Sequence, residues 1–185
     1  MIAGVDEAGR GPLAGPVVSA AVVLPDTFGI DGIDDSKKLT PKKRSELFPR
    51  IQDAALAVGV GIVDAETIDR INILQASLRS MAMAVEDLSL SPDFLLIDGT
   101  FEIPLSLPQK ALPKGDSLSV SIAAASIIAK VTRDRMMVEF DKIYPQYGFA
   151  KHKGYPTRAH KQAVRNFGCS PIHRKSFKGV KETLV

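Results

Sequence analysis

The sequence contains a single cysteine, Cys169, so no disulfide bond can form within the chain. One unpaired cysteine is typical of a reducing compartment, and we expect the protein to be cytoplasmic. There is no pair of cysteines with the spacing of a zinc–thiolate site. The sequence also lacks a run of about 18 apolar residues and a basic N-terminal region. We therefore expect no membrane association and no secretory signal.

No internal repeat, low-complexity stretch or linker divides the 185 residues, of which 45% are hydrophobic and 24% charged. This length and composition are typical of one soluble globular domain. We expect a single domain over residues 1–185, in which residues from about 145 to 185 form a helical appendage.

Charge is distributed unevenly along the chain. Residues 1–110 carry 10 basic residues (Lys and Arg) and 16 acidic residues (Asp and Glu), a net charge of −6. Residues 111–185 carry 14 basic and 5 acidic residues, a net charge of +9. Positive charge that holds phosphates, beside carboxylates that hold metal ions, is what a nuclease needs. The alternative is a solvated basic tail without a specific role.

Short β-branched segments alternate with amphipathic ones, which predicts an α/β fold with a mixed sheet. We expect strands at 2–5, 16–24, 56–63, 94–97 and 110–112, and helices at 40–55, 71–88, 119–144 and 157–167. Thr40 followed by Pro41 is typical of a helix start, and Asp64 can cap a further short helix. The first half of the 119–144 helix is apolar nearly all round, which predicts burial on several sides.

Four acidic residues stand at the ends of these elements. Asp6 and Glu7 close the first strand, Asp98 closes the fourth, and Asp116 precedes the long helix. Neighbouring residues on a strand point to opposite faces, so Asp6 and Glu7 share one site only if the chain bends or Glu7 contributes differently. Without a metal, the same acids could be a solvent-facing pair, a turn-forming aspartate and a helix cap.

Hydrolysis of a phosphodiester needs an activated water and a stabilised leaving oxygen. Two Mg²⁺ or Mn²⁺ ions about 3.5–4 Å apart provide both, and such ions take oxygen ligands. No histidine lies near these acids in sequence, which argues against zinc. Asp134 competes with Asp116 for the fourth place, but it follows Lys130 by four residues, which favours an ion pair.

Six segments together resemble the ribonuclease HII family over nearly the whole chain. They are GVDEAGRGPLAGPV at 4–17, DSKKL at 35–39, IDG at 97–99, KGD at 114–116 leading into SIAAASIIAK at 121–130, HKGY at 152–155 and HRKSF at 173–177. The resemblance implies a ribonuclease H-like fold, with a five-stranded mixed sheet flanked by helices and a C-terminal helical part that closes over the substrate.

The resemblance also implies an activity. Asp6, Glu7, Asp98 and Asp116 would hold two catalytic metal ions, which decides for Asp116 over Asp134. The substrate would be the RNA strand of an RNA–DNA hybrid, including a single ribonucleotide in duplex DNA. The cut would fall on the 5′ side of the ribonucleotide and leave 3′-hydroxyl and 5′-phosphate ends.

An enzyme that distinguishes RNA from DNA at one nucleotide reads the 2′-hydroxyl and the shape it imposes. In the family, the loop that matches Gly9, Arg10 and Gly11 reaches that hydroxyl, and the tyrosine that matches Tyr155 stacks on the neighbouring deoxyribose. From the residues alone, a plain turn and a packed surface tyrosine are the preferred interpretations. We expect Ser36 and Lys37 to hold a backbone phosphate. Such a contact does not read the base sequence.

Aspartate rather than glutamate at position 116, and the short sequence before the first strand, favour ribonuclease HII over the related ribonuclease HIII. We expect a monomer, and no sliding-clamp motif is evident after Phe177. Two other functions remain open from the sequence. One is a structure-specific DNA nuclease of the same superfamily, such as a junction resolvase, and the other is a non-enzymatic nucleic-acid-binding module.

Overall fold

A computed structural model describes residues 1–34 and 36–183, so Asp35 of the 35–39 segment lies outside the described residues. Within them, five strands form one sheet in the order β3-β2-β1-β4-β5. The strands are β1 (Ile2–Ala8), β2 (Val17–Val23), β3 (Ala57–Val63), β4 (Phe94–Asp98) and β5 (Gln109–Leu112). β1 pairs antiparallel with β2 and parallel with β4, which confirms the predicted mixed sheet.

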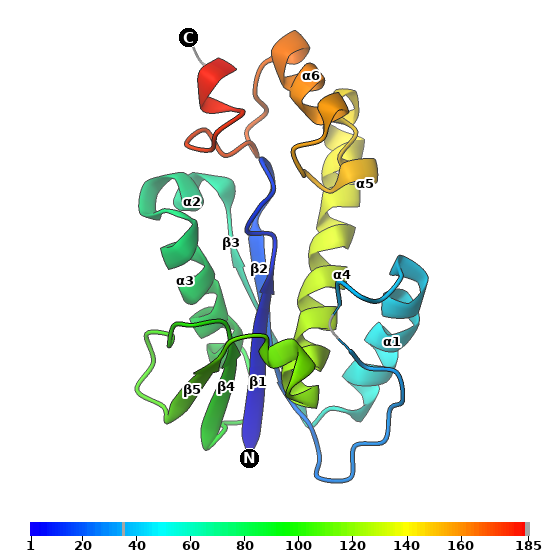
Figure 1. Ribbon diagram of the computed structural model, residues 1–185, viewed down its shortest axis with the longest axis vertical. Coiled ribbons are helices and arrows are strands. Elements are labelled where there is room, and N and C mark those ends of the chain that lie inside the picture. Colours follow the sequence, from blue (N-terminus) through cyan, green and yellow to red (C-terminus); the bar gives the residue numbers. More distant parts are fainter. Residues whose placement is uncertain (35, 184–185) are drawn as a thin grey trace.

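Helices cover both faces of this sheet (Figure 1). α2 (Ala65–Ile71) and α3 (Ile73–Glu86) lie on one face, and α4 (Val120–Ile143) lies on the other with α1 (Pro41–Ala54) outside it. α5 (Phe149–His152) and α6 (Arg158–Phe167) lie beyond the end of the sheet, and short 3-10 turns occupy Gly115–Ser117, Pro145–Tyr147 and Lys181–Thr183. None of the helices in the described chain is long and apolar enough to cross a membrane.

The helix starts follow the predicted chemistry closely. The Thr40 side chain accepts a hydrogen bond from the Lys43 N–H at 3.2 Å, and Pro41 is the first residue of α1. Asp64 caps α2 in the same way. The predicted 71–88 helix instead begins at Ile73, because Asn72 has a φ of +67° and caps α3 with its own side chain.

β1 extends further than its apolar run predicts. It continues through Asp6 and Glu7 to Ala8, and all three residues pair with β2. β1 lies at the centre of the sheet, where backbone groups must find partners, so pairing continues although the side chains become acidic. Asp6 and Glu7 therefore lie within a regular strand rather than after it.

The long helix α4 lies directly on β1 and β2. The first half of α4 packs its alanines and isoleucines between β2 and α1, which confirms the predicted burial on several sides. A Cβ atom on Gly4 would lie 2.2 Å from the carbonyl carbon of Ser121, so a glycine at this place in β1 lets the helix backbone approach the sheet. This close approach brings the start of α4 beside Asp6.

A separate apolar cluster holds the C-terminal helices. Met137 near the end of α4 packs with Tyr147, Phe149 and Val164, and with Ala14 from the loop that joins β1 to β2. The loop of residues 9–16 is thus enclosed between the sheet and the C-terminal part of the chain.

Candidate metal centre

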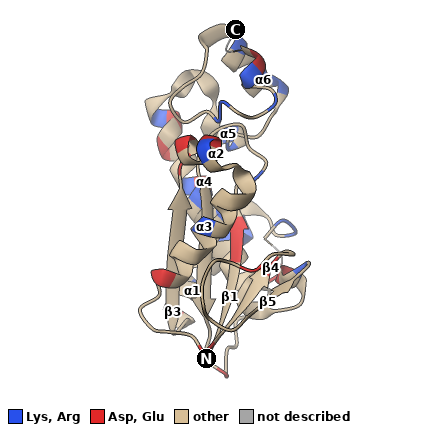
Figure 2. Cartoon of the chain, turned by 90° about the vertical axis from the view of Figure 1, so that its left-hand side faces the viewer, with Lys and Arg blue, Asp and Glu red and all other residues tan. Residues whose placement is uncertain are grey.

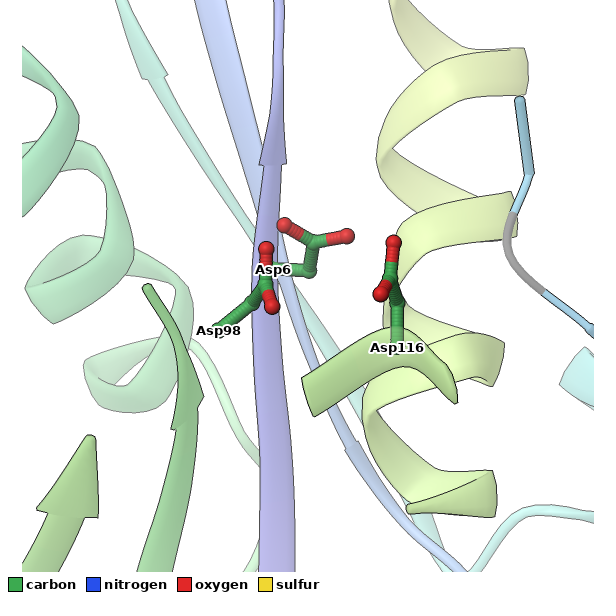
Figure 3. Close-up of side chains that lie close together, drawn as sticks. All are labelled: Asp6, Asp98 and Asp116. Atoms are coloured by element: carbon green, nitrogen blue, oxygen red, sulfur yellow. The ribbon is translucent and has the colours of Figure 1, made fainter. Parts of the chain in front are cut away.

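Three carboxylates from separate parts of the fold meet at the sheet (Figure 3). Asp6 comes from β1, Asp98 from the end of β4, and Asp116 from the 3-10 turn before α4. One carboxylate oxygen of each residue lies within 4.8 Å of the others. Like charges at this separation repel one another, and oxygen donors grouped in this way are typical ligands of hard divalent cations.

The environment of Asp6 fits a bound cation. The side chain is buried, and its Oδ1 atom accepts a hydrogen bond from the Glu7 N–H at 2.6 Å. Within the described residues, the buried Oδ2 atom has no hydrogen-bond partner. Burial raises the pKa of Asp6 well above its usual value, and the charges of Glu7 and Asp98 raise it further. A buried acceptor of this kind is costly, and a cation would satisfy it.

Asp98 also fixes the segment that carries Asp116. Its Oδ1 atom accepts a hydrogen bond from the Gly115 N–H at 2.7 Å. The N-cap of α4 is Ser119, so Asp116 lies one turn earlier and is not the helix cap that the sequence left open. The Oδ2 atom of Asp116 lies 3.8 Å from Nζ of Lys37.

Glu7 is not part of this three-carboxylate group. β1 keeps its regular pairing with β2 through Ala8, so Glu7 faces the side opposite to Asp6, where it lines a pocket with Arg10 and Asp98. Its Oε1 atom lies 3.5 Å from Nη1 of Arg10. Burial raises the pKa of Glu7, and Asp98 adds to this whereas Arg10 opposes it. Asp98 thus interacts with the acids on both faces of β1.

Asp134 lies outside the site, on α4. Its Oδ1 atom accepts a hydrogen bond from Nζ of Lys130 at 2.7 Å, which confirms the predicted ion pair. Asp116 occupies the place beside Asp6 and Asp98 instead.

The residues predicted to read the ribonucleotide come together from distant parts of the sequence. A Cβ atom on Gly11 would lie 3.8 Å from Cε1 of Tyr155, which places the ring against the loop. Tyr155 is 42% exposed, and Nζ of Lys130 lies 5.8 Å from the centre of its ring. Tyr155 is therefore exposed to solvent beside Gly11.

The two residues predicted to hold a phosphate have different environments. Lys37 is exposed, whereas Ser36 is buried and its hydroxyl forms a 2.8 Å hydrogen bond with the hydroxyl of Ser126 on α4. The Ser36 hydroxyl is thus engaged inside the protein, and Lys37 is the member of the pair that solvent and a phosphate can reach.

Lys and Arg residues gather over α6 and the neighbouring C-terminal segment (Figure 2). Lys161, Arg165 and Lys178 line a pocket there, and Gly11 lies at its edge. The basic surface expected from the sequence thus begins next to the loop that lies beside Tyr155.

The basic residues of the C-terminal tail are expected to hold phosphates, but this is wrong for Arg174, which is fully buried beneath the 9–16 loop. Arg133, to which sequence reasoning assigned no role, is fully buried there as well. Arg133 lies in the part of α4 that the sequence marks as polar. Arg174 belongs to the HRKSF segment, whose match to a family was the only sequence signal that could have drawn attention to it.

Comparison with known proteins gives consistent matches. A family model described as ribonuclease HII matches residues 3–180. Ribonuclease HII of Geobacter metallireducens is 64% identical over 184 residues, which cover 100% of this chain and 86% of the relative. Ribonuclease HII of Geobacter sulfurreducens is 61% identical over 183 residues, or 99% and 84% of the two chains. The crystal structure of ribonuclease H2 from Pyrococcus horikoshii OT3 superposes with a TM-score of 0.81 at 29% identity, covering 98% of this chain and 96% of that one.

Proposed function

The chain belongs to the ribonuclease HII family, and from this we propose its specific substrate and cleavage site. As a member of that family it is a metal-dependent endonuclease of the ribonuclease H type, with the matching α/β fold. It cuts the RNA strand of RNA–DNA hybrids and cuts 5′ of a single ribonucleotide in duplex DNA, leaving 3′-hydroxyl and 5′-phosphate ends. The observation that carries this proposal is the meeting of Asp6, Asp98 and Asp116 close to a loop that lies beside the exposed Tyr155.

We assign Asp6, Glu7, Asp98 and Asp116 as the ligands of two divalent ions, Mg²⁺ or Mn²⁺. The unpartnered Oδ2 atom of Asp6 and the absence of histidine from the group support oxygen-seeking ions over zinc. When bound, such ions supply an activated water and stabilise the leaving oxygen. Glu7 serves from the other face of β1, where Asp98 lies beside it.

Recognition of the ribonucleotide falls to the loop of Gly9, Arg10 and Gly11 together with Tyr155. The backbone of this loop meets the 2′-hydroxyl, which is the group that distinguishes RNA from DNA. The ring of Tyr155 stacks on the adjacent deoxyribose. The position of the Tyr155 ring beside Gly11 supports a shared role, because one nucleotide step can reach both residues.

The basic surface holds the duplex through its phosphates and so confers little base preference. We assign this role to Lys37, Lys161, Arg165 and Lys178, and give Ser36 the supporting role of holding the segment that carries Lys37. All of these groups come from residues 1–185 of one chain. We therefore propose a single catalytic unit that acts as a monomer, with residues from about 145 onward as its substrate-binding part.

The test compares three duplexes of the same sequence: all DNA, DNA with one ribonucleotide, and an RNA–DNA hybrid. Each is incubated with Mg²⁺, with Mn²⁺ or with EDTA, and the cut position is mapped at single-nucleotide resolution. We expect metal-dependent cutting 5′ of the ribonucleotide and an intact all-DNA duplex. Equal cutting of the all-DNA duplex would indicate a structure-specific DNA nuclease. Binding without product in either metal would indicate a non-enzymatic module.

A further inference from the structure

Two arginine side chains, Arg133 on α4 and Arg174 in the C-terminal segment, are buried without any exposed surface. Within residues 1–34 and 36–183, neither forms a salt bridge with a carboxylate. Burial lowers the pKa of Arg133 to about 10 and that of Arg174 to about 9. Two buried cations without a counter-ion are costly, so their hydrogen bonds must compensate for the lost water.

Those hydrogen bonds go almost entirely to the loop of residues 9–16. Arg174 donates four, at 2.6–3.0 Å, to the carbonyl oxygens of Gly9, Arg10, Pro12 and Gly15. Arg133 donates three, at 2.9–3.0 Å, to the carbonyl oxygens of Ala14, Pro16 and Lys153. Six of the seven acceptors thus belong to one short loop, which the two guanidinium groups hold from beneath.

The loop is shaped to admit the guanidinium of Arg133. Gly9 has a φ of +103°, and a Cβ atom there would lie only 2.1 Å from Nε of Arg133. A glycine at position 9 therefore removes the side chain that would otherwise displace Arg133, and it tolerates the left-handed backbone. The loop therefore packs against the Arg133 side chain at Gly9, whereas Gly11 faces Tyr155.

The carbonyl groups of Gly9 and Arg10 point toward the buried Arg174, so the N–H groups of the same peptide units point the opposite way. Within the described residues, the N–H groups of Arg10 and Gly11 donate no hydrogen bond. A carbonyl that accepts from a cation polarises its peptide unit and makes the neighbouring N–H a stronger donor. Buried positive charge behind the loop therefore favours an oxygen ligand in front of it.

We propose that Arg133 and Arg174 are positioning residues that hold the 9–16 loop in the conformation that recognises the ribonucleotide. The proposal rests on the function proposed above, because its ligand is the 2′-hydroxyl of the substrate. Lysine cannot replace either residue, since one ammonium lacks the planar fork that reaches three or four carbonyls at once. Neither arginine touches the substrate or the carboxylate group.

The experiment uses Arg174→Lys and Arg133→Lys, with Arg79→Lys as the matched control because Arg79 is exposed on α3, away from the loop. Gly9→Ala perturbs the same contact from the loop side. Three quantities are measured for each variant: the single-turnover rate of cutting at one ribonucleotide, the affinity for the all-DNA duplex, and the affinity for Mn²⁺. Circular dichroism and thermal melting report folding.

We expect the cutting rate of Arg174→Lys to fall about 30- to 100-fold, as expected for the loss of charged hydrogen bonds. Affinities for the all-DNA duplex and for Mn²⁺ should stay within about twofold of wild type, because the phosphate contacts and carboxylates are untouched. Arg133→Lys and Gly9→Ala should show the same separation of rate from affinity, and Arg79→Lys should match wild type.

Folded variants that keep a near-normal cutting rate would overturn the proposal. So would a parallel loss of rate and of both affinities, or loss of folding in all three loop variants, because the arginines would then serve the fold rather than the loop. If wild-type protein leaves the ribonucleotide duplex uncut, the proposed function itself fails. If wild type cuts and the variants cut equally well, only the assignment of the arginines is wrong.

Discussion

The Nε2 atoms of His160 and His173 lie 3.0 Å apart in the interior of the C-terminal part. The Ser170 N–H donates to Nδ1 of His173, so the proton of His173 is assigned to Nε2, from which it donates to His160. Nδ1 of His160 then donates to the carbonyl oxygen of Tyr155 at 2.9 Å. Both rings are neutral in this arrangement, which ties the backbone of Tyr155 to the segment before Arg174.

This pair predicts a loss of stability in mild acid. Burial lowers the pKa of both His160 and His173 to about 4; repulsion from His152 adds to this for both rings, and repulsion from His160 adds to it for His173. Below pH 6.5 the unfolded chain takes up protons that the folded chain cannot, so stability falls between pH 6.5 and 4 and is unaffected by this pair above pH 7. Urea unfolding at pH 7.5, 6 and 5 measures the slope.

His173→Gln is the matching variant. It should cost about 1–3 kcal/mol at pH 7.5, because a buried partner of His160 is lost. Its stability should then decline less steeply than that of wild type between pH 6 and 5. Equal slopes for the two proteins would show that the histidine pair does not control this transition.

Asp98→Asn should abolish cutting while the substrate still binds. The amide oxygen can keep the hydrogen bond from the Gly115 N–H, but one of the charges that would hold the cations is removed. A loss of at least about 100-fold corresponds to about 2.7 kcal/mol of transition-state stabilisation. Without metal, the melting temperature should rise because repulsion with Asp6 is relieved, and Mn²⁺ should add less stability than in wild type. Near-normal activity would remove Asp98 from the metal site.

Asp116→Asn and Asp134→Asn form a second pair of tests. The first removes a member of the carboxylate group and should reduce cutting as strongly as Asp98→Asn. The second breaks only the ion pair with Lys130, which is worth about 0.5 kcal/mol, and should leave the rate within about threefold of wild type. Steady-state cleavage with Mn²⁺ separates the two, and the opposite order of effects would make Asp134 the fourth ligand.

Tyr155 should act through its ring rather than its hydroxyl. Tyr155→Ala should lower kcat/KM on the single-ribonucleotide duplex by about tenfold or more, since loss of one stacking contact costs about 1–3 kcal/mol. Tyr155→Phe keeps the ring beside Gly11 and should stay within about threefold of wild type. A strong defect in the phenylalanine variant would point to the hydroxyl instead.

Gly4→Ala should damage the site from a distance. The added methyl group would overlap the backbone of Ser121 and Ile122, so α4 must move away from β1. We expect a loss of about 1–3 kcal/mol in unfolding free energy. Mn²⁺ affinity should also fall, because the turn that carries Asp116 is joined to α4. A variant that loses stability but binds Mn²⁺ normally would show that the site tolerates this movement.

Local chemistry made several features predictable. Thr40 and Asp64 cap helices as their side chains suggest, because a cap needs only an N–H two or three residues away. The apolar first half of α4 predicted its burial, and the i, i+4 spacing predicted the ion pair of Lys130 with Asp134. The matched segments also identified the family over most of the chain.

The amino-acid sequence by itself determined the α/β class, the helix starts and the acids that could bind metal, since each depends on neighbours along the chain. Tertiary structure alone decided that Asp6, Asp98 and Asp116 meet while Glu7 faces the other side of β1. It also decided that Arg174 reaches back across the fold to the carbonyl of Gly9. Such pairings join residues far apart in number, and only the packing of α4 and the C-terminal segment against the sheet brings them within bonding distance.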